Sequence, residues 1–369
     1  MSEKISSRQA ILFITISRVT TILTTMPIIY MPPANQDIWM VIIVAFFYTT
    51  LVCTPLLFLS NRFNEFTIIE YTEKILGKVF GKVVGALYGI FFLTVAILFS
   101  YIAIQMVRTS FLTNTKPILT IIFLMGCCMY VASKGVDVIL RGSELLVPII
   151  LVFIIIFVVL GYSSIDLKIL LPIYKDSSFL DINIGAIQMS FIFVDIFIIS
   201  MIAPKLENKK DINKIFIKAV FCSSLFILLV VVATQASLGI EQTKHSNFPF
   251  LSYIRRMKTY SIFERVESVY ILIWIVAMMG KIVMYTYIAT ETFKEVFNKK
   301  DRNFILYIIG TFIILITYYF AEYRPILIEI KSIPLLEYIY YFIFETFIPL
   351  VLVIVYIFRR KKFKTGETE

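Results

Sequence analysis

Ten apolar runs, each long enough to cross a bilayer as a helix, occupy most of this chain of 369 residues. A hydrocarbon core of about 30 Å requires roughly 20 apolar residues in helical conformation, and a helix closes its backbone hydrogen bonds within one such segment. Only 16% of the residues are charged, against about 25% in soluble domains. We therefore predict an all-α polytopic membrane protein. The expected spans are residues 9–30, 38–59, 83–109, 117–133, 138–161, 185–204, 214–239, 266–292, 303–322 and 335–358.

The lysines and arginines between these spans indicate which side of the membrane each segment faces, because cytoplasmic segments are enriched in them. If the N-terminus is cytoplasmic, 22 of the 35 basic residues fall on inner segments and 10 on outer ones. This asymmetry predicts that both termini face the cytoplasm. The basic stretch RRKKFK at 359–364 would hold the last span against anionic lipid. No small-residue cleavage site follows the first nine residues, so we expect the first span to be retained.

Several functional classes find no support among the residues. All four cysteines (Cys53, Cys127, Cys128 and Cys222) lie within apolar runs, and the chain has one histidine, His245. This pattern argues against a disulfide framework and against a metal or haem centre. The sequence contains no Walker, GxSxG or GxGxxG motif, so we expect neither an enzyme nor a cofactor. The net charge of +10 fits basic cytoplasmic loops rather than a nucleic-acid partner.

Two connecting segments have a character of their own. Residues 65–82 place apolar side chains at helical spacing with lysines on the other face, which predicts an interfacial helix on the inner leaflet. The apolar positions are Phe66, Ile69, Ile75, Leu76, Val79 and Phe80. Residues 240–265 form the longest outer connection. A solvated loop and a short helix that caps an outer vestibule are both compatible with this segment.

Spans 1 and 6 share one arrangement of polar residues. Arg18 precedes Pro27 by nine residues, and Asp195 precedes Pro204 by nine residues. Spans 1 and 6 correspond if the helices form two five-helix halves of opposite orientation, as in many secondary transporters. We therefore predict a single permease-like domain over residues 1–369. Its first repeat would cover about 9–161, and its second about 185–322 with the helix 335–358.

Four ionisable residues lie deep within the predicted spans: Arg18, Asp195, Lys281 and Glu345. A charge at the bilayer centre costs at least about 2.5–3.5 kcal/mol on insertion scales, so such a group usually faces the bundle interior and has a partner. Arg18 and Asp195 would form a structural ion pair, or these groups would surround a polar cavity. The two interpretations are compatible with each other.

Local motifs along the chain resemble those of the spore germination permease family, the B subunits of nutrient germinant receptors in the amino acid–polyamine–organocation superfamily. The resemblance covers essentially the whole chain and rests on the order of several motifs. They are ISSRQ at 5–9, EYTEKILGKVFGK at 70–82, RGSELLVP at 141–148, LLPIY at 170–174 and FERVESVYILIWI at 263–275.

This resemblance implies an integral protein of the inner spore membrane, the cell membrane of an endospore former. Such a protein would work with a membrane-anchored A subunit and a lipoprotein C subunit. It would bind a small nutrient, often an amino acid, and help to trigger germination. A proton-coupled secondary transporter that carries an amino acid inward is the alternative, since the fold would be the same.

Members of the superfamily usually interrupt span 1 with glycines, but this chain has no glycine before Gly77. A continuous first helix is therefore one possibility. The other is an interruption at which freed amides around residues 19–24 face a ligand carboxylate. For a site between spans 1, 3, 6 and 8 we predict threonine hydroxyls, two tyrosine walls and charged groups. The candidate ligand-binding residues are Arg18, Thr20, Thr21, Thr24, Tyr101, Asp195, Lys281 and Tyr285.

Lys281 has a more specific interpretation within this site. In sodium-coupled relatives a cation bridges spans 1 and 8. A lysine ammonium near that place could substitute for the cation, so that no sodium would be needed.

Overall fold

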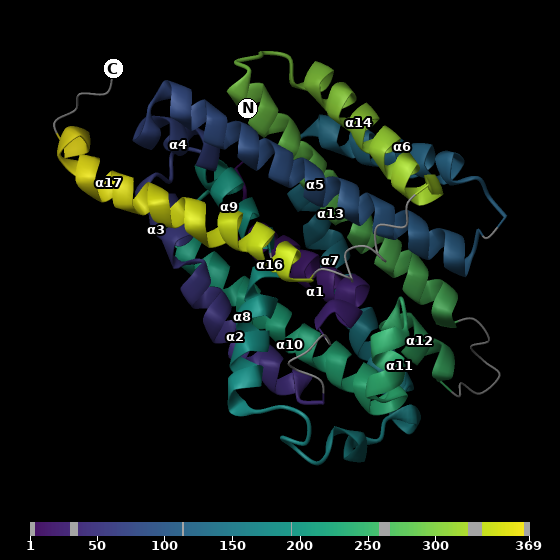
Figure 1. Cartoon of the computed structure of the whole chain (residues 1–369). Coiled ribbons are helices and arrows are strands. Elements are labelled where there is room, and N and C mark those ends of the chain that lie inside the picture. Colours follow the sequence, from purple (N-terminus) through teal and green to yellow (C-terminus); the bar gives the residue numbers. More distant parts are fainter. Residues whose placement is uncertain are drawn as a thin grey trace.

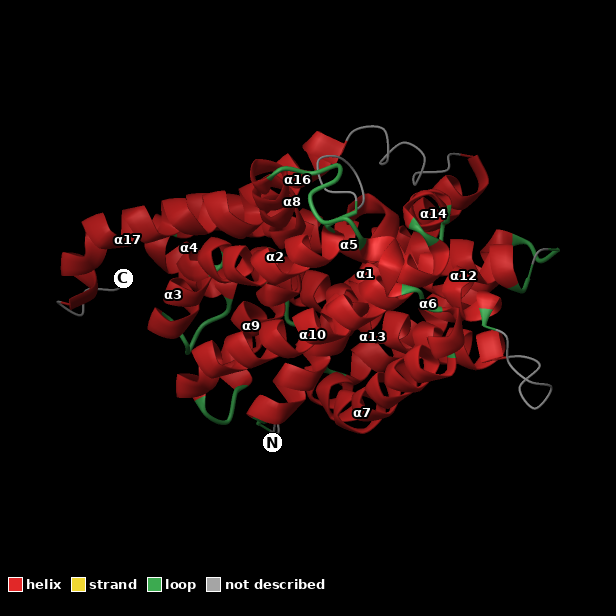
Figure 2. Cartoon of the chain, turned by 90° about the horizontal axis from the view of Figure 1, so that it is seen from below, coloured by secondary structure: helices red, strands yellow, loops and turns green. Residues whose placement is uncertain are grey.

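The computed structural model describes residues 4–29, 36–112, 114–192, 194–257, 266–323 and 334–364, and these are largely helical (Figures 1 and 2). An isolated parallel bridge joins Ile5 to Leu206 beside the start of the first helix. The helices are α1 Ser7–Ile29, α2 Ile38–Val52, α3 Thr54–Arg62, α4 Ile68–Leu76, α5 Lys78–Ser110, α6 Pro117–Lys134, α7 Val136–Leu160, α8 Phe179–Ile192, α9 Phe197–Ile202, α10 Ile212–Leu238, α11 Ile240–His245, α12 Pro249–Arg256, α13 Val266–Val296, α14 Arg302–Tyr323, α16 Pro334–Phe342 and α17 Ile348–Lys364.

Seven described segments are long and apolar enough to cross a membrane. They are Lys78–Ser110, Pro117–Lys134, Val136–Leu160, Lys209–Leu238, Val266–Val296, Arg302–Tyr323 and Tyr338–Arg360. Helices α2 and α3 form an eighth if the pair, bent by 43°, counts as one span. The other two predicted spans coincide with α1 and with the α8–α9 segment. The prediction of an all-α polytopic membrane protein is confirmed, whereas the number of ten spans and the side of the termini stay predictions.

The bend between α2 and α3 has a local cause in Pro55, which occupies the first turn of α3. Proline lacks the amide hydrogen that would bond to the carbonyl four residues earlier, and its ring crowds that turn. The two helices are nevertheless joined through Cys53, whose amide donates to the Thr49 carbonyl at 3.1 Å. A single apolar run of the sequence thus becomes two helices.

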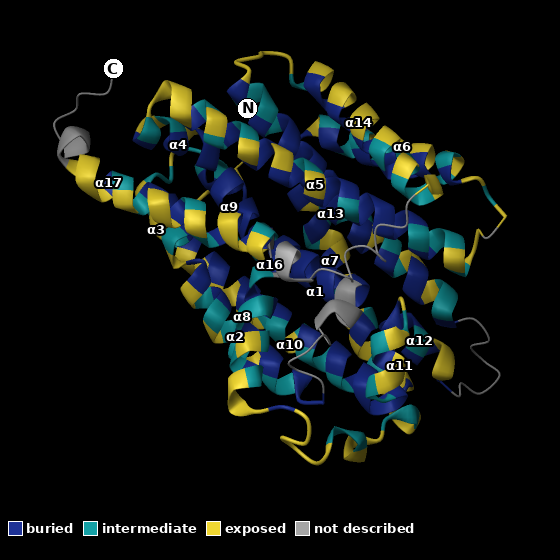
Figure 3. Cartoon of the chain, viewed as in Figure 1, coloured by how far each residue is buried: buried dark blue, intermediate teal, exposed yellow. Residues whose placement is uncertain are grey.

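Helices α5 and α13 form the centre of the bundle. About 67% of the residues in the most apolar stretch of each helix are buried, against 28–33% for α6, α7 and α14. The outer helices therefore carry exposed stripes, which lie mainly over α6, α14 and α17 in Figure 3. α13 packs against α5, α6, α7, α14 and α1, and α1 packs between α10 and α7. The lipid-facing surface is apolar, as expected for a bundle in a membrane, and polar side chains gather inside.

Helix α1 is continuous from Ser7 to Ile29, so the interruption at residues 19–24 is wrong. Two of its threonine hydroxyls bond back to the preceding turn, which a helix tolerates: Thr21 donates to the Ser17 carbonyl at 3.0 Å and Thr24 to the Thr20 carbonyl at 2.6 Å. The amides of this stretch lie inside an unbroken helix, and they are not available to a ligand carboxylate.

The segment from Phe179 to Lys205 is interrupted. Helix α8 ends at Ile192, the 3-10 turn η3 covers Val194–Ile196, and α9 continues only to Ile202. A second 3-10 turn, η4 (Ala203–Lys205), contains Pro204. The β-branched residues around Asp195 have lower helix propensity than unbranched ones, and aspartate favours helix ends over helix interiors. These preferences match an interruption at Asp195.

A helix, α4, forms within the predicted interfacial segment but is shorter than expected, and its place at the inner leaflet stays a prediction. Thr67 and Glu70 form a reciprocal capping box at the start of α4, and Gly77, with φ of +89°, ends it. Val79 and Phe80 already belong to α5 and are 74% and 71% exposed, so their assignment to the interfacial helix is wrong. A left-handed glycine between two helices explains the division, because other residues rarely adopt that conformation.

The outer connection contains two short helices, α11 and α12, in place of a solvated loop. Phe250, Tyr253 and Ile254 of α12 are buried, and α12 packs against α10 and α13. This segment is thus helical over Ile240–His245 and Pro249–Arg256, whereas its role as the cap of an outer vestibule stays a prediction and residues 258–265 lie outside the described part of the chain.

Candidate functional site

Asp195 lies in η3, where the interrupted segment passes through the centre of the bundle. Its side chain has no exposed surface. The Ser17 hydroxyl of α1 donates to Oδ1 at 2.5 Å, and the Tyr285 hydroxyl of α13 donates to the same atom at 3.1 Å. A buried carboxylate requires such partners, because removal from water is very costly for an unpaired charge.

Lys281 of α13 supplies the opposite charge. Its Nζ lies 3.0 Å from Oδ1 of Asp195 and donates to the Ser17 carbonyl at 3.2 Å and to the Thr21 hydroxyl. These three acceptors match the three hydrogens of an ammonium. The ammonium therefore bridges α1, η3 and α13. We call Ser17, Thr21, Asp195, Lys281 and Tyr285 the ion-pair cluster.

The Phe99 ring of α5 lies against this ammonium from the side. The ring centroid is 4.2 Å from Nζ of Lys281, within the range of a cation–π interaction. Tyr285 contributes a second ring, 5.9 Å from the same atom. The central helix α5 thus holds the lysine through an aromatic face rather than through a polar group.

Arg18 does not form the direct ion pair with Asp195 that the sequence suggested. Nε of Arg18 donates to the Ser223 hydroxyl of α10 at 2.8 Å, and the guanidinium interacts electrostatically with Asp195 without being its ion partner. The reason is helical geometry: successive residues point about 100° apart around a helix axis. Ser17 faces α13, so Arg18 is directed toward α10. The predicted Arg18–Asp195 pair is therefore wrong, and Lys281 takes its place.

The other predicted site residues are buried but are not part of the cluster. Thr20 and Thr24 lie on α1, and the Thr24 hydroxyl is bonded to the Thr20 carbonyl. The Thr20 hydroxyl has no hydrogen-bond partner among the described residues. Tyr101 is buried on α5, and its role in ligand binding stays a prediction, as do the roles of the two threonines.

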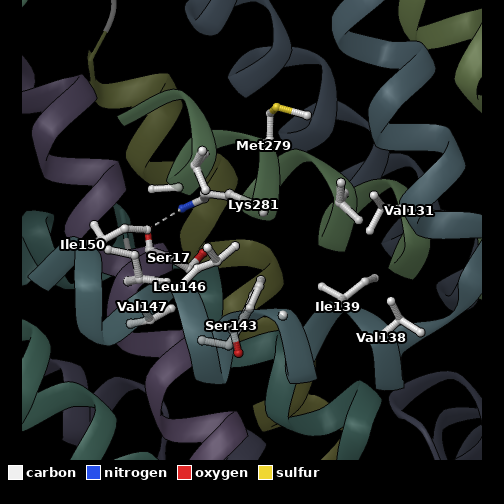
Figure 4. Close-up of a pocket in the computed structure, with 17 residues that line it drawn as sticks. Ser17, Val131, Val138, Ile139, Ser143, Leu146, Val147, Ile150, Met279 and Lys281 are labelled. Carbon is white, nitrogen blue, oxygen red and sulfur yellow. Dashed lines mark hydrogen bonds between the residues drawn. The ribbon is translucent and has the colours of Figure 1, made fainter. Parts of the chain in front are cut away.

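A cavity of about 340 Å³ lies beside the ion-pair cluster, between α1, α6, α7 and α13. Figure 4 shows Lys281 and Ser17 on its wall, joined by their hydrogen bond, while the remaining lining is mostly aliphatic. Val138 and Leu146 of α7 line the same cavity and are exposed on the outside of the bundle. We call this space the α7 cavity. Its lining is mostly apolar, as in most small-molecule sites, and Lys281, whose side chain is buried, is the one charged residue among the described residues that line it.

Sequence reasoning missed Ser17, Phe99 and Ser223 as members of this region. Ser17 was recognisable in principle, because it lies four residues before Thr21 and therefore on the same face of α1. Phe99 is one of 34 phenylalanines and Ser223 is preceded and followed by apolar runs, so neither carries a signal before the helices are packed. Within the described residues, no group of three His, Cys, Asp or Glu side chains is placed to hold a metal ion.

The apolar helices surround a fully buried ion pair at an interrupted helix, and this bundle has the fold of a membrane transporter. The solved structure of a substrate-bound, outward-open Na⁺-coupled sialic acid symporter is similar, with a TM-score of 0.63 and 10% sequence identity. The match covers 93% of this chain and 79% of the symporter chain. At that identity the likeness concerns the fold alone.

The family of the chain follows from its sequence relatives. The family model described as spore germination protein, the spore permease family, matches residues 4–324, and the chain belongs to this family. Spore germination protein KB of Bacillus subtilis (strain 168) is 24% identical over 314 residues, which cover 81% of each chain. Spore germination protein A2 of the same organism is 23% identical and covers 81% of this chain and 82% of its own.

Proposed function

We propose that this chain is the membrane subunit of a spore germinant receptor in the inner spore membrane. It binds a small amino acid at the ion-pair cluster and works with A and C subunits to trigger germination. The observation that carries the proposal is the contact of Lys281 with both Asp195 and the α7 cavity. An amino acid is a zwitterion; Lys281 lines the cavity, and Asp195, which does not line it, is bonded to Lys281 behind the wall.

Ligand entry would exchange partners within the cluster. The ligand carboxylate would take the place of Asp195 at the Lys281 ammonium, and the ligand ammonium would bind the released carboxylate. Because Lys281 also holds α1 through the Ser17 carbonyl and the Thr21 hydroxyl, a change at its ammonium is transmitted directly to α1. The aliphatic lining would accept an apolar side chain, and about 340 Å³ is within the range of small-molecule pockets.

A cavity-filling substitution tests this site. Gly142 lines the α7 cavity, and a Cβ added there meets no atom within 4 Å, so Gly142→Leu fills the cavity without displacing the backbone. We expect the concentration of amino acid that triggers germination to rise at least tenfold in a strain that carries this receptor alone. Gly126→Leu on α6 is the matched control, because Gly126 also has open space around it and does not line the cavity.

An unchanged dose response in the Gly142→Leu strain, at normal protein level, would remove the α7 cavity from ligand binding. A wild-type strain that responds to sugars or nucleosides but to no amino acid would contradict the ligand class instead.

The second candidate is a proton-coupled amino acid transporter, favoured by the position of the Lys281 ammonium. It bridges α1 and α13, as a coupling cation would. Uptake of labelled amino acid by proteoliposomes that contain this chain alone would support the transporter. A response only with the A and C subunits, and no uptake, would support the receptor.

A further inference from the structure

Glu345 lies in a π-helical turn that joins α16 to α17. This turn, η6, covers Ile343–Phe347, and the Ile348 amide bonds to the Ile343 carbonyl five residues earlier. Pro349 explains why the helix widens here. Proline cannot donate to the carbonyl four residues before it, which is that of Glu345, and its ring crowds the same position. Single π turns of this kind are frequent at functional sites.

The Glu345 side chain has no exposed surface, and neither carboxyl oxygen has a hydrogen-bond partner among the described residues. Asp195 is equally buried but is bonded to Ser17, Tyr285 and Lys281. Two acidic groups in the same interior thus have opposite surroundings. The neighbours of Glu345 in the turn are packed as well, since Phe344 stacks on Phe91 at 4.5 Å and its carbonyl accepts from Tyr88 at 3.2 Å.

The charged and titratable groups near Glu345 come from several helices of the bundle. Arg18 and Asp195 interact with it electrostatically. Cys53, Tyr88 and Tyr285 are also close enough to Glu345 for an electrostatic interaction. Asp195 is already neutralised by Lys281. Arg18 is the cation within electrostatic reach of Glu345, and its Nε is engaged by Ser223.

An ionised carboxylate in these surroundings would be extremely costly, because burial without hydrogen bonds removes its solvation without compensation. A carboxyl group avoids that cost by binding a proton. The neutral acid needs far less solvation, so the neutral form fits the surroundings of Glu345.

We propose that Glu345 is a proton-binding site that holds a proton in this conformation and releases it when the bundle opens around the π turn. On opening, water reaches the carboxyl group and accepts the proton. The carboxylate that remains is then neutralised by Arg18. Because Arg18 and two of the acceptors of Lys281, the Ser17 carbonyl and the Thr21 hydroxyl, lie on the same helix, movement of α1 couples this proton to the ion-pair cluster. The proton site itself does not depend on the identity of any nutrient.

Infrared spectroscopy of the full chain in lipid nanodiscs tests the proposal directly. At neutral pH we expect an absorption band of a protonated carboxylic acid that shifts in deuterated water and is lost in Glu345→Gln. A carbonyl without a hydrogen bond absorbs at a higher frequency than a bonded one. Glu295, whose carboxyl accepts from Thr67 at 2.9 Å, therefore provides a matched control: Glu295→Gln should leave the high-frequency band in place.

Stability against pH provides a second and independent measurement. Unfolded glutamate is ionised at neutral pH, so the folded protein would bind one proton more than the unfolded protein. Stability then falls as pH rises, by about tenfold in the folding equilibrium constant per pH unit over the range in which the proton stays bound. Glu345→Gln, which has the shape of the neutral acid, should fold and should remove this component of the slope.

A wild-type spectrum without a band that Glu345→Gln removes would overturn the proposal. So would pH slopes that are equal in the wild type and in Glu345→Gln. Neither result would bear on nutrient binding, which the Gly142→Leu experiment tests separately.

Discussion

Helix α1 and the α8–α9 segment both carry polar residues in mid-membrane, but their backbones differ at these residues. α1 keeps an unbroken helix and places Ser17 and Thr21 on one face and Arg18 on another. The α8–α9 segment is interrupted by a 3-10 turn at Asp195. Hydroxyls can bond to the turn before them, so a helix accepts them at low cost. The two segments meet at Lys281, which contacts both.

The comparison teaches that equivalent positions in a proposed repeat do not require equivalent backbones. Arg18 and Asp195 have the same spacing to a proline, yet only the second lies at an interruption. In a bundle, polar groups freed at one interrupted helix can be satisfied by side chains from an uninterrupted one. Here the Ser17 hydroxyl donates a hydrogen bond to Asp195, and the Ser17 carbonyl accepts one from Lys281.

The largest expected effect comes from separating the charges that join the two segments. Asp195→Asn or Lys281→Met alone should destabilise the protein by about 3–5 kcal/mol, because each leaves a buried charge unpaired. The double variant should be much closer to the wild type than the sum of the two losses. Unfolding of the purified variants in detergent micelles measures this coupling. Additive losses would show that the pair does not hold α1, η3 and α13 together.

The same cycle with Arg18→Met and Asp195→Asn sharpens the assignment of partners. Its coupling should be clearly smaller, since Arg18 bonds to Ser223 and acts on Asp195 only through electrostatics of longer range. A coupling as large as that of Lys281 would restore the pairing that the sequence first suggested.

A medium effect is expected from the two adjacent threonines of α1. Thr21→Val removes an acceptor of the Lys281 ammonium and should cost about 1.5–3 kcal/mol, as for other hydrogen bonds to charged groups. Thr20→Val is the matched control, because the Thr20 hydroxyl is buried without a partner among the described residues and its loss should be neutral or slightly stabilising. Thermal unfolding of both variants in micelles compares them. Equal losses of stability in the two variants would mean that the hydrogen bond from Lys281 to Thr21 does not stabilise the protein.

The smallest effect concerns the backbone itself. In a continuous helix, a glycine variant of the protein should be about 1 kcal/mol less stable than the alanine variant at the same position. We expect that difference between Val19→Gly and Val19→Ala in α1, and a smaller one between Ile196→Gly and Ile196→Ala at the 3-10 turn. Both positions are buried, so the comparison with alanine cancels most of the lost packing. A larger glycine–alanine difference at Ile196 than at Val19 would contradict the assignment of α1 as the continuous helix and of the α8–α9 segment as the interrupted one.

Much of the candidate site could be predicted because ionisable groups are rare in membrane spans and costly there. That argument selected Asp195 and Lys281, and the expected polar and aromatic lining of a pocket added Thr21 and Tyr285. It could not select partners. Asp195 and Lys281 are separated by 86 residues, and which of two cations meets the acid depends on how α1 and α13 are rotated about their axes. The interruption considered for α1 is absent, and a helix tolerates threonine hydroxyls that bond back to the preceding turn.

The sequence by itself determined that this protein is a helical membrane protein and which of its charges must be buried, because the cost of placing a segment in lipid is a property of that segment alone. Only the tertiary structure decided that Lys281 pairs with Asp195, that Arg18 turns to Ser223 and that Glu345 stays without a hydrogen bond in its π turn. The physical reason is that each of these outcomes depends on the relative depth and rotation of helices that are distant in the chain. A rotation of about 100°, the angle between successive residues of a helix, is enough to bring a different side chain to the same partner.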